Sequence, residues 1–365
     1  MRSHLINRAP GTVFARLKLV HTHLAVLIAL SLLLRTASDA AALVAAAGNP
    51  ATSAPATSAP ATSAPATSAP ATSAPATTSH PAASKPAGET LARPFKTQGI
   101  YIQQYTVLKK PKLDHLINNS LEVGVDTMVV DLWWPSAKYK AAVQHIQEHG
   151  LRYVPRITMF PDGGTHQQIT NKAYWEERWK LAKYALDLGA KDIQLDYIRY
   201  SSKNRASPSN ALNVREVLRF FKKRVNEGGA QLQIDVFGEV GLAPSMHIGQ
   251  DISVFAPDID AVCPMVYPSH YAPYAETALR PFETVFSSLE GIKRQMGSQQ
   301  VPVLAYIELF NFRHKMNTVE RVKYIRAQLR AVREAKAEGW LAWSAGNHYD
   351  LLFEILRQYK DQAAG

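Results

Sequence analysis

From Gln98 to the C-terminus, short runs rich in β-branched and aromatic residues alternate with amphipathic segments of helical period. No other feature of the chain restricts its fold as strongly, because this alternation is typical of parallel strands joined by helical crossovers. Eight runs occur, and they predict an α/β fold, a (β/α)8 TIM barrel, over residues 97–360. The predicted strands are Gly99–Tyr105, Thr127–Trp133, Tyr153–Phe160, Asp192–Ile198, Gln231–Phe237, Ala261–Tyr267, Val301–Glu308 and Trp340–Ser344.

The segments between these runs are predicted helices with one apolar face, among them Tyr174–Leu188, Val214–Val225 and Val319–Ala335. Asn317 and Glu320 form a capping-box pattern at the start of the last one. An open doubly wound sheet would show a similar pattern over the first six strands. No Gly-x-Gly-x-x-Gly follows the first run, however, which disfavours a dinucleotide-binding sheet.

The first 96 residues offer little that a core could bury. Residues 1–42 place basic residues before an apolar run, Leu24–Leu34, which a small-residue stretch follows, and this is the order of a secretory signal peptide. The alternative, a permanent membrane anchor, normally needs a run of roughly 20 apolar residues. We therefore expect an exported protein, periplasmic, at the cell surface or secreted, with possible membrane association through its N-terminus.

Residues 43–96 are predicted to be a disordered linker. The pentapeptide Ala-Thr-Ser-Ala-Pro recurs five times without a break from Ala51 to Pro75. Proline at every fifth position, without large apolar side chains, favours an extended and partly polyproline chain. The segment is either a stalk that holds the barrel away from a surface or a plain spacer.

Charge limits the expected partners of the chain, and cysteine content limits its sources of stability. The formal net charge of +11 suits anionic polymers or a negatively charged envelope. Lys and Arg are not interleaved with stacking aromatics, and no zinc-finger spacing occurs, so nucleic acid is not an expected partner. The single cysteine, Cys263, excludes an internal disulfide and leaves a large hydrophobic core as the source of stability.

Two neighbouring strands are predicted to carry inward carboxylates, because alternate side chains of a barrel strand face the helices and the interior. Ile193 and Leu195 suit the helix side, which leaves Gln194 and Asp196 pointing inward. The next strand repeats the pattern and places Asp235 inward. Both carboxylates then lie toward the C-terminal end of the barrel, where active sites of this fold occur.

A buried carboxylate needs a cation or access to water. Arg156, inward by the same alternation, and Arg199, just after Asp196, are the available cations. Structural roles remain open: Asp196 and Arg199 could form a static ion pair, and Asp235 could accept backbone hydrogen bonds.

Polar and aromatic residues also gather at the ends of the other predicted strands. Asp131 and Glu308 could be functional or structural, and Glu239, two residues past the fifth strand, is interpreted as a loop residue. Aromatic rings pack against the C–H faces of sugars, while carboxylates and amides bind hydroxyls, so this rim favours a saccharide cleft.

Four histidines, His166, His247, His270 and His348, fall in loops after predicted strands. The first strand has Gln and Tyr where a His-x-His pair would be needed, and no His-Glu-x-x-His motif occurs. No metal or other cofactor is therefore expected.

Several longer motifs resemble a known family, the bacterial "putative glycoside hydrolase domain" family. They are Gln194–Tyr200, Asp235–Gly238, Gly249–Asp251, Pro264–Tyr271 and Gly339–Asn347, and the similarity extends over about residues 98–350. The resemblance implies a TIM barrel related to amylase-like and other polysaccharide-cleaving barrels. It also implies that Asp196 and Asp235 are the functional carboxylates, with Tyr267 and Asn347 lining the cleft. In that family the seventh strand ends in a Gln-Asp pair, where this chain has Glu308-Leu309.

These observations lead to a hypothesis of glycosidic-bond hydrolysis on a polysaccharide or oligosaccharide. Asp196 is the expected nucleophile or base and Asp235 the expected acid, with Glu308 as a substitute acid or stabiliser. The competing hypothesis is a polysaccharide-binding barrel of the cell envelope without turnover, and a third is an enzyme acting on peptidoglycan-linked or amino sugars. The substrate-binding candidates are Tyr105, Asp131, Trp133, Arg156, Arg199, Tyr267, His270, Tyr271, Trp343 and Asn347.

Overall fold

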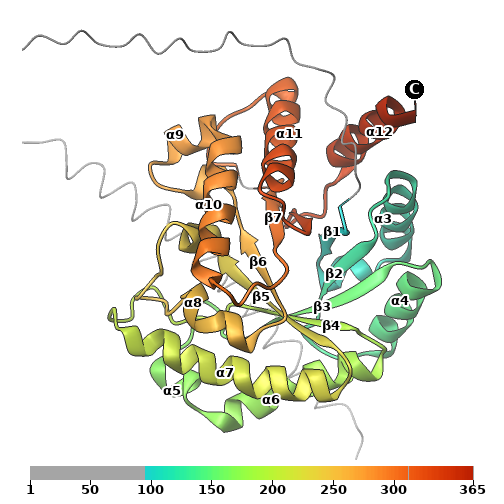
Figure 1. Cartoon of the computed structure of the whole chain (residues 1–365). Coiled ribbons are helices and arrows are strands. Elements are labelled where there is room, and N and C mark those ends of the chain that lie inside the picture. Colours follow the sequence, from blue (N-terminus) through green and yellow to red (C-terminus); the bar gives the residue numbers. More distant parts are fainter. Residues whose placement is uncertain (1–94, 311, 365) are drawn as a thin grey trace, which may run out of the picture. The chain divides into compact units, whose positions relative to one another are not determined.

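The computed structural model describes residues 95–310 and 312–364, which form a single closed barrel of parallel strands surrounded by helices (Figure 1). The predicted signal segment and nearly all of the predicted linker lie outside the described residues. All eight predicted strands are present, and they pair in sequence order, with β8 closing onto β1. The strands are β1 (Thr97–Ile102), β2 (Thr127–Asp131), β3 (Arg152–Thr158), β4 (Asp192–Asp196), β5 (Gln231–Phe237), β6 (Ala261–Met265), β7 (Leu304–Glu308) and β8 (Gly339–Trp343).

Helices connect successive strands and cover the barrel. The capping box predicted at Asn317 and Glu320 is present at the start of α11. Among the described residues no helix is both long and apolar enough to cross a bilayer. The α-helices are α2 (Gln104–Val107), α3 (Lys110–Val123), α4 (Ala137–Glu148), α5 (His166–Ile169), α6 (Lys172–Asp187), α7 (Pro208–Glu227), α8 (Ile252–Phe255), α9 (Tyr274–Leu279), α10 (Pro281–Met296), α11 (Thr318–Glu334) and α12 (Asp350–Ala364), and the 3-10 turns are η1 (Gly238–Gly241), η2 (Ala256–Asp258) and η3 (Pro268–His270).

Closure of the barrel depends on a glycine at the start of β8. Gly339 pairs with Thr97 of β1 on one side and with Leu304 of β7 on the other. A Cβ atom at Gly339 would lie 2.2 Å from the backbone oxygen of Thr97, so any larger residue would push the first and last strands apart. Since the sheet closes, the doubly wound alternative is excluded.

The predicted alternation along β4 is confirmed. Ile193 and Leu195 are fully buried in the hydrophobic layer that the strands share with the helices. Gln194 lies inside the barrel, where its Oε1 accepts a hydrogen bond from Tyr306 Oη at 2.7 Å and its Nε2 lies 3.2 Å from Cys263 Sγ. The barrel interior is therefore polar and aromatic, and this polarity continues upward to the C-terminal ends of the strands.

Candidate active site

Asp196 is the last residue of β4, and the backbone turns sharply immediately after it. Tyr197 has φ 53°, a left-handed conformation that is uncommon for a large side chain. The turn brings the Tyr197 N–H to Asp196, where it donates a hydrogen bond to Oδ1 at 2.5 Å. Such local strain is often found at functional sites, where the surrounding structure maintains it. Here it fixes the direction of one carboxylate.

Arg156 of β3 joins carboxylates from three other strands. Its Nη1 lies 2.5 Å from Asp131 Oδ1 at the end of β2, and its Nη2 donates to Asp196 Oδ2. Its Nε lies 3.5 Å from Asp235 Oδ2 on β5. Tyr101 Oη of β1 donates to the second oxygen of Asp131 at 2.5 Å. Tyr101, Asp131, Arg156, Asp196 and Asp235 thus form a charged layer across one side of the barrel. Asp196 thus pairs with Arg156, whereas the static partner considered from the sequence was Arg199.

Burial and mutual repulsion set the proton affinities in this layer. Burial, followed by the neighbouring Asp196 carboxylate, raises the pKa of Asp235 well above its ordinary value, and burial also raises the pKa of Asp131. Burial alone would lower the pKa of Arg156, but the carboxylates of Asp196 and Asp131 more than offset it. Asp235 Oδ1 is buried with no hydrogen-bond partner in the described structure, which suits a protonated carboxyl group.

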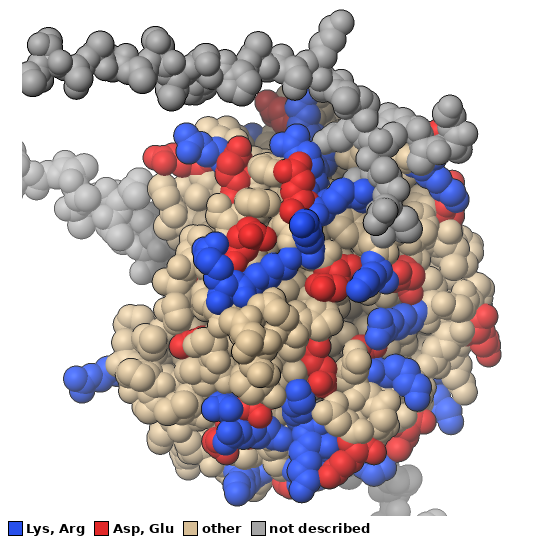
Figure 2. All heavy atoms as spheres, viewed as in Figure 1, with Lys and Arg blue, Asp and Glu red and all other residues tan. Residues whose placement is uncertain are grey.

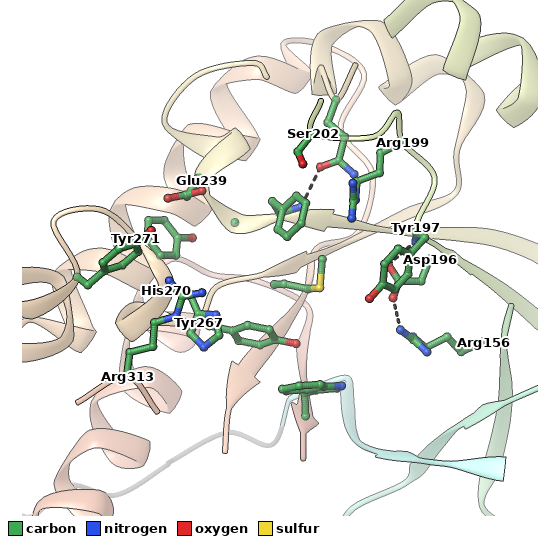
Figure 3. Close-up of a pocket in the computed structure, with 16 residues that line it drawn as sticks. Arg156, Asp196, Tyr197, Arg199, Ser202, Glu239, Tyr267, His270, Tyr271 and Arg313 are labelled. Carbon is green, nitrogen blue, oxygen red and sulfur yellow. Dashed lines mark hydrogen bonds and ion pairs between the residues drawn. The ribbon is translucent and has the colours of Figure 1, made fainter. Parts of the chain in front are cut away.

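A cavity of about 730 Å³ opens above this layer, at the C-terminal end of the barrel (Figure 3). Of the residues predicted from the sequence, Asp196, Arg156, Arg199, Tyr267, His270, Tyr271 and Trp343 line it. The rings of Tyr267 and Trp343 stack with their centroids 5.5 Å apart. An acidic group, several basic groups and aromatic faces therefore surround a space large enough for a saccharide.

The remaining predicted residues do not line this cavity. Asp131 and Asp235 lie in the charged layer, with 0% and 1% of their surface exposed. Asn347 binds the backbone oxygen of Tyr101 at 3.0 Å and accepts from Gln103 N–H at 3.1 Å, and so ties the loop after β8 to β1. These contacts indicate a positioning role for all three side chains.

Tyr105 and Trp133 form a separate aromatic group on the rim. The Tyr105 ring packs edge-on against Trp133 and Trp134, with centroids 5.4 and 5.2 Å away. Gln104 Oε1 accepts from Trp133 N–H at 2.6 Å and fixes the loop after β2. Tyr105 and Trp133 are 52% and 38% exposed, so their faces are available to ligands outside the main cavity.

Glu308, at the end of β7, has both carboxylate oxygens occupied. Ser269 donates to it through its backbone N–H at 3.1 Å and its hydroxyl at 2.5 Å, and Tyr324 Oη donates at 2.7 Å. The side chain is fully buried and does not line the cavity. Its contacts hold η3 against the barrel, where His270 reaches the cavity, and this geometry favours a structural role over the substitute-acid role predicted from the sequence.

Replacing Glu308 with glutamine is therefore expected to lower the free energy of unfolding by about 1–3 kcal/mol, because an amide NH2 cannot accept the hydrogen bonds that the carboxylate oxygen accepts. Urea denaturation followed by circular dichroism measures this loss. Turnover at saturating substrate should change far less than it does on replacement of Asp196. A loss of turnover without a loss of stability would instead indicate that Glu308 has a catalytic role.

Two charged residues of the cavity wall were not identified from the sequence as functional. Glu239, interpreted there as a loop residue, lies in η1 and faces the cavity from the side opposite Asp196 (Figure 3). Arg313 follows β7 in a loop without regular structure and also lines the cavity. The only signal that could have found them is their position after a strand end. Among the described residues no group of three or more His, Cys, Asp or Glu side chains is arranged to hold a metal ion.

A closed (β/α)8 barrel with a charged and aromatic cavity at the C-terminal strand ends has the architecture of many carbohydrate-active enzymes. The chain belongs to the family described as "putative glycosyl hydrolase domain", whose model matches residues 162–349. The match begins in the loop after β3 and ends after β8, so it includes Asp196, Asp235 and most of the cavity. No protein sequence with a curated function matches this chain.

Solved structures with similar folds include several glycosidases. An endo-1,4-β-mannanase from Rhizomucor miehei has a TM-score of 0.56 at 10% identity, over 75% of this chain and 96% of that one. The spore cortex-lytic enzyme SleL from Bacillus cereus has a TM-score of 0.54 at 13% identity, over 72% and 74%. A class V chitinase from Pseudomonas fluorescens Pf-5 has a TM-score of 0.52 at 11% identity, over 72% and 99%. At these identities the likeness shows the barrel fold alone.

Proposed function

We propose that this protein is a glycoside hydrolase that cleaves a polysaccharide or oligosaccharide in the cavity above Asp196. The observation that carries the proposal is the position of Asp196, fixed by Arg156 and by the strained turn at Tyr197, in the wall of a cavity lined by Tyr267 and Trp343. Glycosidic hydrolysis requires a carboxyl group next to the sugar ring, and the ion pair with Arg156 holds Asp196 in that position.

Asp196 is proposed as the nucleophile or base, and Glu239 as the proton donor to the leaving group. A general acid must reach the glycosidic oxygen. Of the described carboxylates other than Asp196, Glu239 is the one that lines the cavity. This criterion favours Glu239 over Asp235, whose side chain is 1% exposed beneath the cavity.

Asp235 is then a positioning residue. It shares Arg156 with Asp196, and its raised pKa keeps a proton in the layer that would otherwise hold three negative charges around one guanidinium. A neutral Asp235 leaves the positive charge of Arg156 to Asp131 and Asp196, which holds the Asp196 side chain in place.

Comparison of Glu239→Gln with Asp235→Asn tests this assignment of roles. Release of reducing ends is measured over pH 4–9 on a panel of chitin, mannan, peptidoglycan, alginate, polygalacturonate and hyaluronate. Loss of the acid should lower turnover by about a hundredfold or more, and azide or a substrate with an activated leaving group should restore part of it. Asp235→Asn should retain measurable turnover with a shifted pH profile.

The reverse pattern, in which Asp235→Asn is inactive and Glu239→Gln is active, would indicate that Asp235 is the general acid. If wild-type protein retards a polysaccharide in affinity electrophoresis but releases no reducing ends at any pH, the proposal of hydrolysis fails and the barrel is a binding module.

A further inference from the structure

Arg199 is a half-buried cation in the cavity wall, and no described residue forms an ion pair with it. Its guanidinium lies over two aromatic rings, 5.2 Å from the centroid of Tyr197 and 5.3 Å from that of Phe237. Its Nη1 donates to the backbone oxygen of Tyr200 at 3.0 Å. None of the ion pairs between described residues includes it, and burial lowers its pKa below the usual value. An arginine held rigidly in this way is prepared for an anion that the protein itself does not supply.

Arg313 is a second cation of this kind. Its guanidinium lies 4.7 Å from the centroid of the Tyr274 ring, and its backbone N–H donates to Ser269 Oγ at 2.9 Å. It is exposed to solvent in the cavity wall and makes no ion pair within the described part of the chain. The aromatic ring orients the guanidinium while its N–H groups stay available.

Among the described residues, the cavity wall therefore contains two arginines with which no acidic side chain pairs. Arg156, the third arginine of the wall, pairs with Asp131 and Asp196. Glu239 is the other acid in the wall, and none of the ion pairs between described residues joins it to Arg199 or Arg313. Figure 2 shows basic and acidic side chains interspersed over the face it presents, so on that face the net positive charge of the chain does not form a single patch. The two arginines that lack an ion-pair partner among the described residues are thus a feature of the cavity wall.

We propose that the saccharide bound in this cavity is anionic, and that Arg199 and Arg313 bind acidic groups, carboxylate or sulfate, on its sugar units. The inference rests on the proposed function, because it specifies the substrate class of the same site. The planar guanidinium forms two parallel hydrogen bonds to a carboxylate or a similar oxyanion, which a neutral hydroxyl cannot match.

The positions of the two arginines add a requirement for length. Figure 3 shows Arg199 and Arg313 on different sides of the cavity, with Asp196 on the side of Arg199. One monosaccharide carries one acidic group, so the two cations suit two acidic sugars of one chain. A ligand with repeated acidic units then places one of them on each side of the scissile bond.

Binding is tested on the full-length Asp196→Asn protein, which holds ligand without cleaving it. The probes are oligosaccharides of polygalacturonate, alginate and hyaluronate, each compared with its carboxyl methyl ester, and dextran sulfate compared with dextran. Isothermal titration calorimetry at two salt concentrations gives the affinities. At least one acidic probe should bind more tightly than its neutral counterpart by about tenfold or more, and this preference should weaken with salt. Preference for the carboxylates or for dextran sulfate identifies the acidic group.

Arg199→Gln and Arg313→Gln, added singly to this protein, should each weaken binding of the preferred acidic probe by about tenfold while leaving its neutral counterpart unaffected. Arg294→Gln on the exposed surface of α10 removes the same charge outside the cavity and should change neither. If no acidic probe binds more tightly than its neutral counterpart, or if Arg294→Gln has the same effect, the proposal is overturned. Asp196-dependent cleavage of a neutral polysaccharide by the wild-type protein would then still support hydrolysis.

Discussion

Replacing Asp196 with asparagine is expected to lower turnover of the saccharide substrate by about a thousandfold or more, with little change in fold. Asparagine has the same shape and retains an oxygen that can accept the Tyr197 N–H, but it supplies neither a nucleophile nor a base. Arg156 keeps Asp131 and Asp235 as partners, so the charged layer stays occupied. Initial rates of reducing-end release, at equal concentrations of folded protein, measure the effect.

The matched control is Asp187→Asn. Asp187 lies on the exposed surface of α6, where it pairs with Lys183, and its side chain is 61% exposed. This variant removes the same charge and should keep full turnover, since exposed pairs contribute little to stability. Turnover of Asp196→Asn within a few-fold of wild type would remove Asp196 from the mechanism. Equal thermal melting of the two variants would show that a loss of rate does not arise from unfolding.

The inward direction of the Asp196 side chain could be predicted because the apolar residues beside it in the strand must face the helices. Ile193 and Leu195 alternate with Gln194 and Asp196, and a strand surrounded by helices must place the apolar pair outward. The local sequence was therefore sufficient to predict which side chains of β4 face the barrel interior. The same alternation correctly placed Arg156 inside the barrel, next to the carboxylate that it binds.

Depth along the barrel could not be predicted in the same way. Asp196 ends its strand, whereas β5 continues for two residues beyond Asp235, so Asp235 lies below the cavity. Alternation fixes the face of a strand but not where the strand ends. Glu308 also ends its strand, yet η3 covers it through Ser269, because the height of a strand end depends on the loops that fold over it.

The positions of the loop residues Glu239 and Arg313 in the cavity wall could not be predicted from the periodic sequence pattern. Their positions follow from the course of η1 and of the segment after β7, which have no repeating pattern in the sequence. The sequence predicted the end of the barrel at which the cavity lies, but not these two residues of its wall.

Replacing Arg156 with methionine is expected to lower the free energy of unfolding by about 3–5 kcal/mol at neutral pH, more than any other single change proposed here. Methionine approximates the aliphatic part of the side chain, so the loss comes mainly from the charge. Without the guanidinium, Asp131 and Asp196 lose their cation and Asp235 its 3.5 Å contact. Burial of carboxylates without a cation is among the most destabilising changes that a single substitution causes.

The loss should depend on pH with a definite sign. Burial already raises the pKa values of Asp131 and Asp235, and removal of Arg156 raises them further. A carboxyl whose pKa is higher in the folded than in the unfolded protein stabilises the fold below its unfolded pKa, here 3.8, and this stabilisation is lost as pH rises through the folded pKa. The deficit of Arg156→Met relative to wild type should thus be smallest near pH 4 and increase toward pH 7.

Urea denaturation at pH 4 and pH 7 measures the loss of stability and its dependence on pH. Two further variants separate the effect of charge from that of packing. Arg219→Met removes an exposed arginine that pairs with Glu216 and Asp258 on the surface, and should change stability by no more than about 0.5 kcal/mol. Adding Asp235→Asn to Arg156→Met removes one uncompensated carboxyl and should recover part of the loss at pH 7 but little at pH 4. An equal deficit at both pH values, unaffected by Asp235→Asn, would instead mean that Arg156 acts through packing. The charged layer beneath Asp196 would then no longer explain how that carboxylate is held in place.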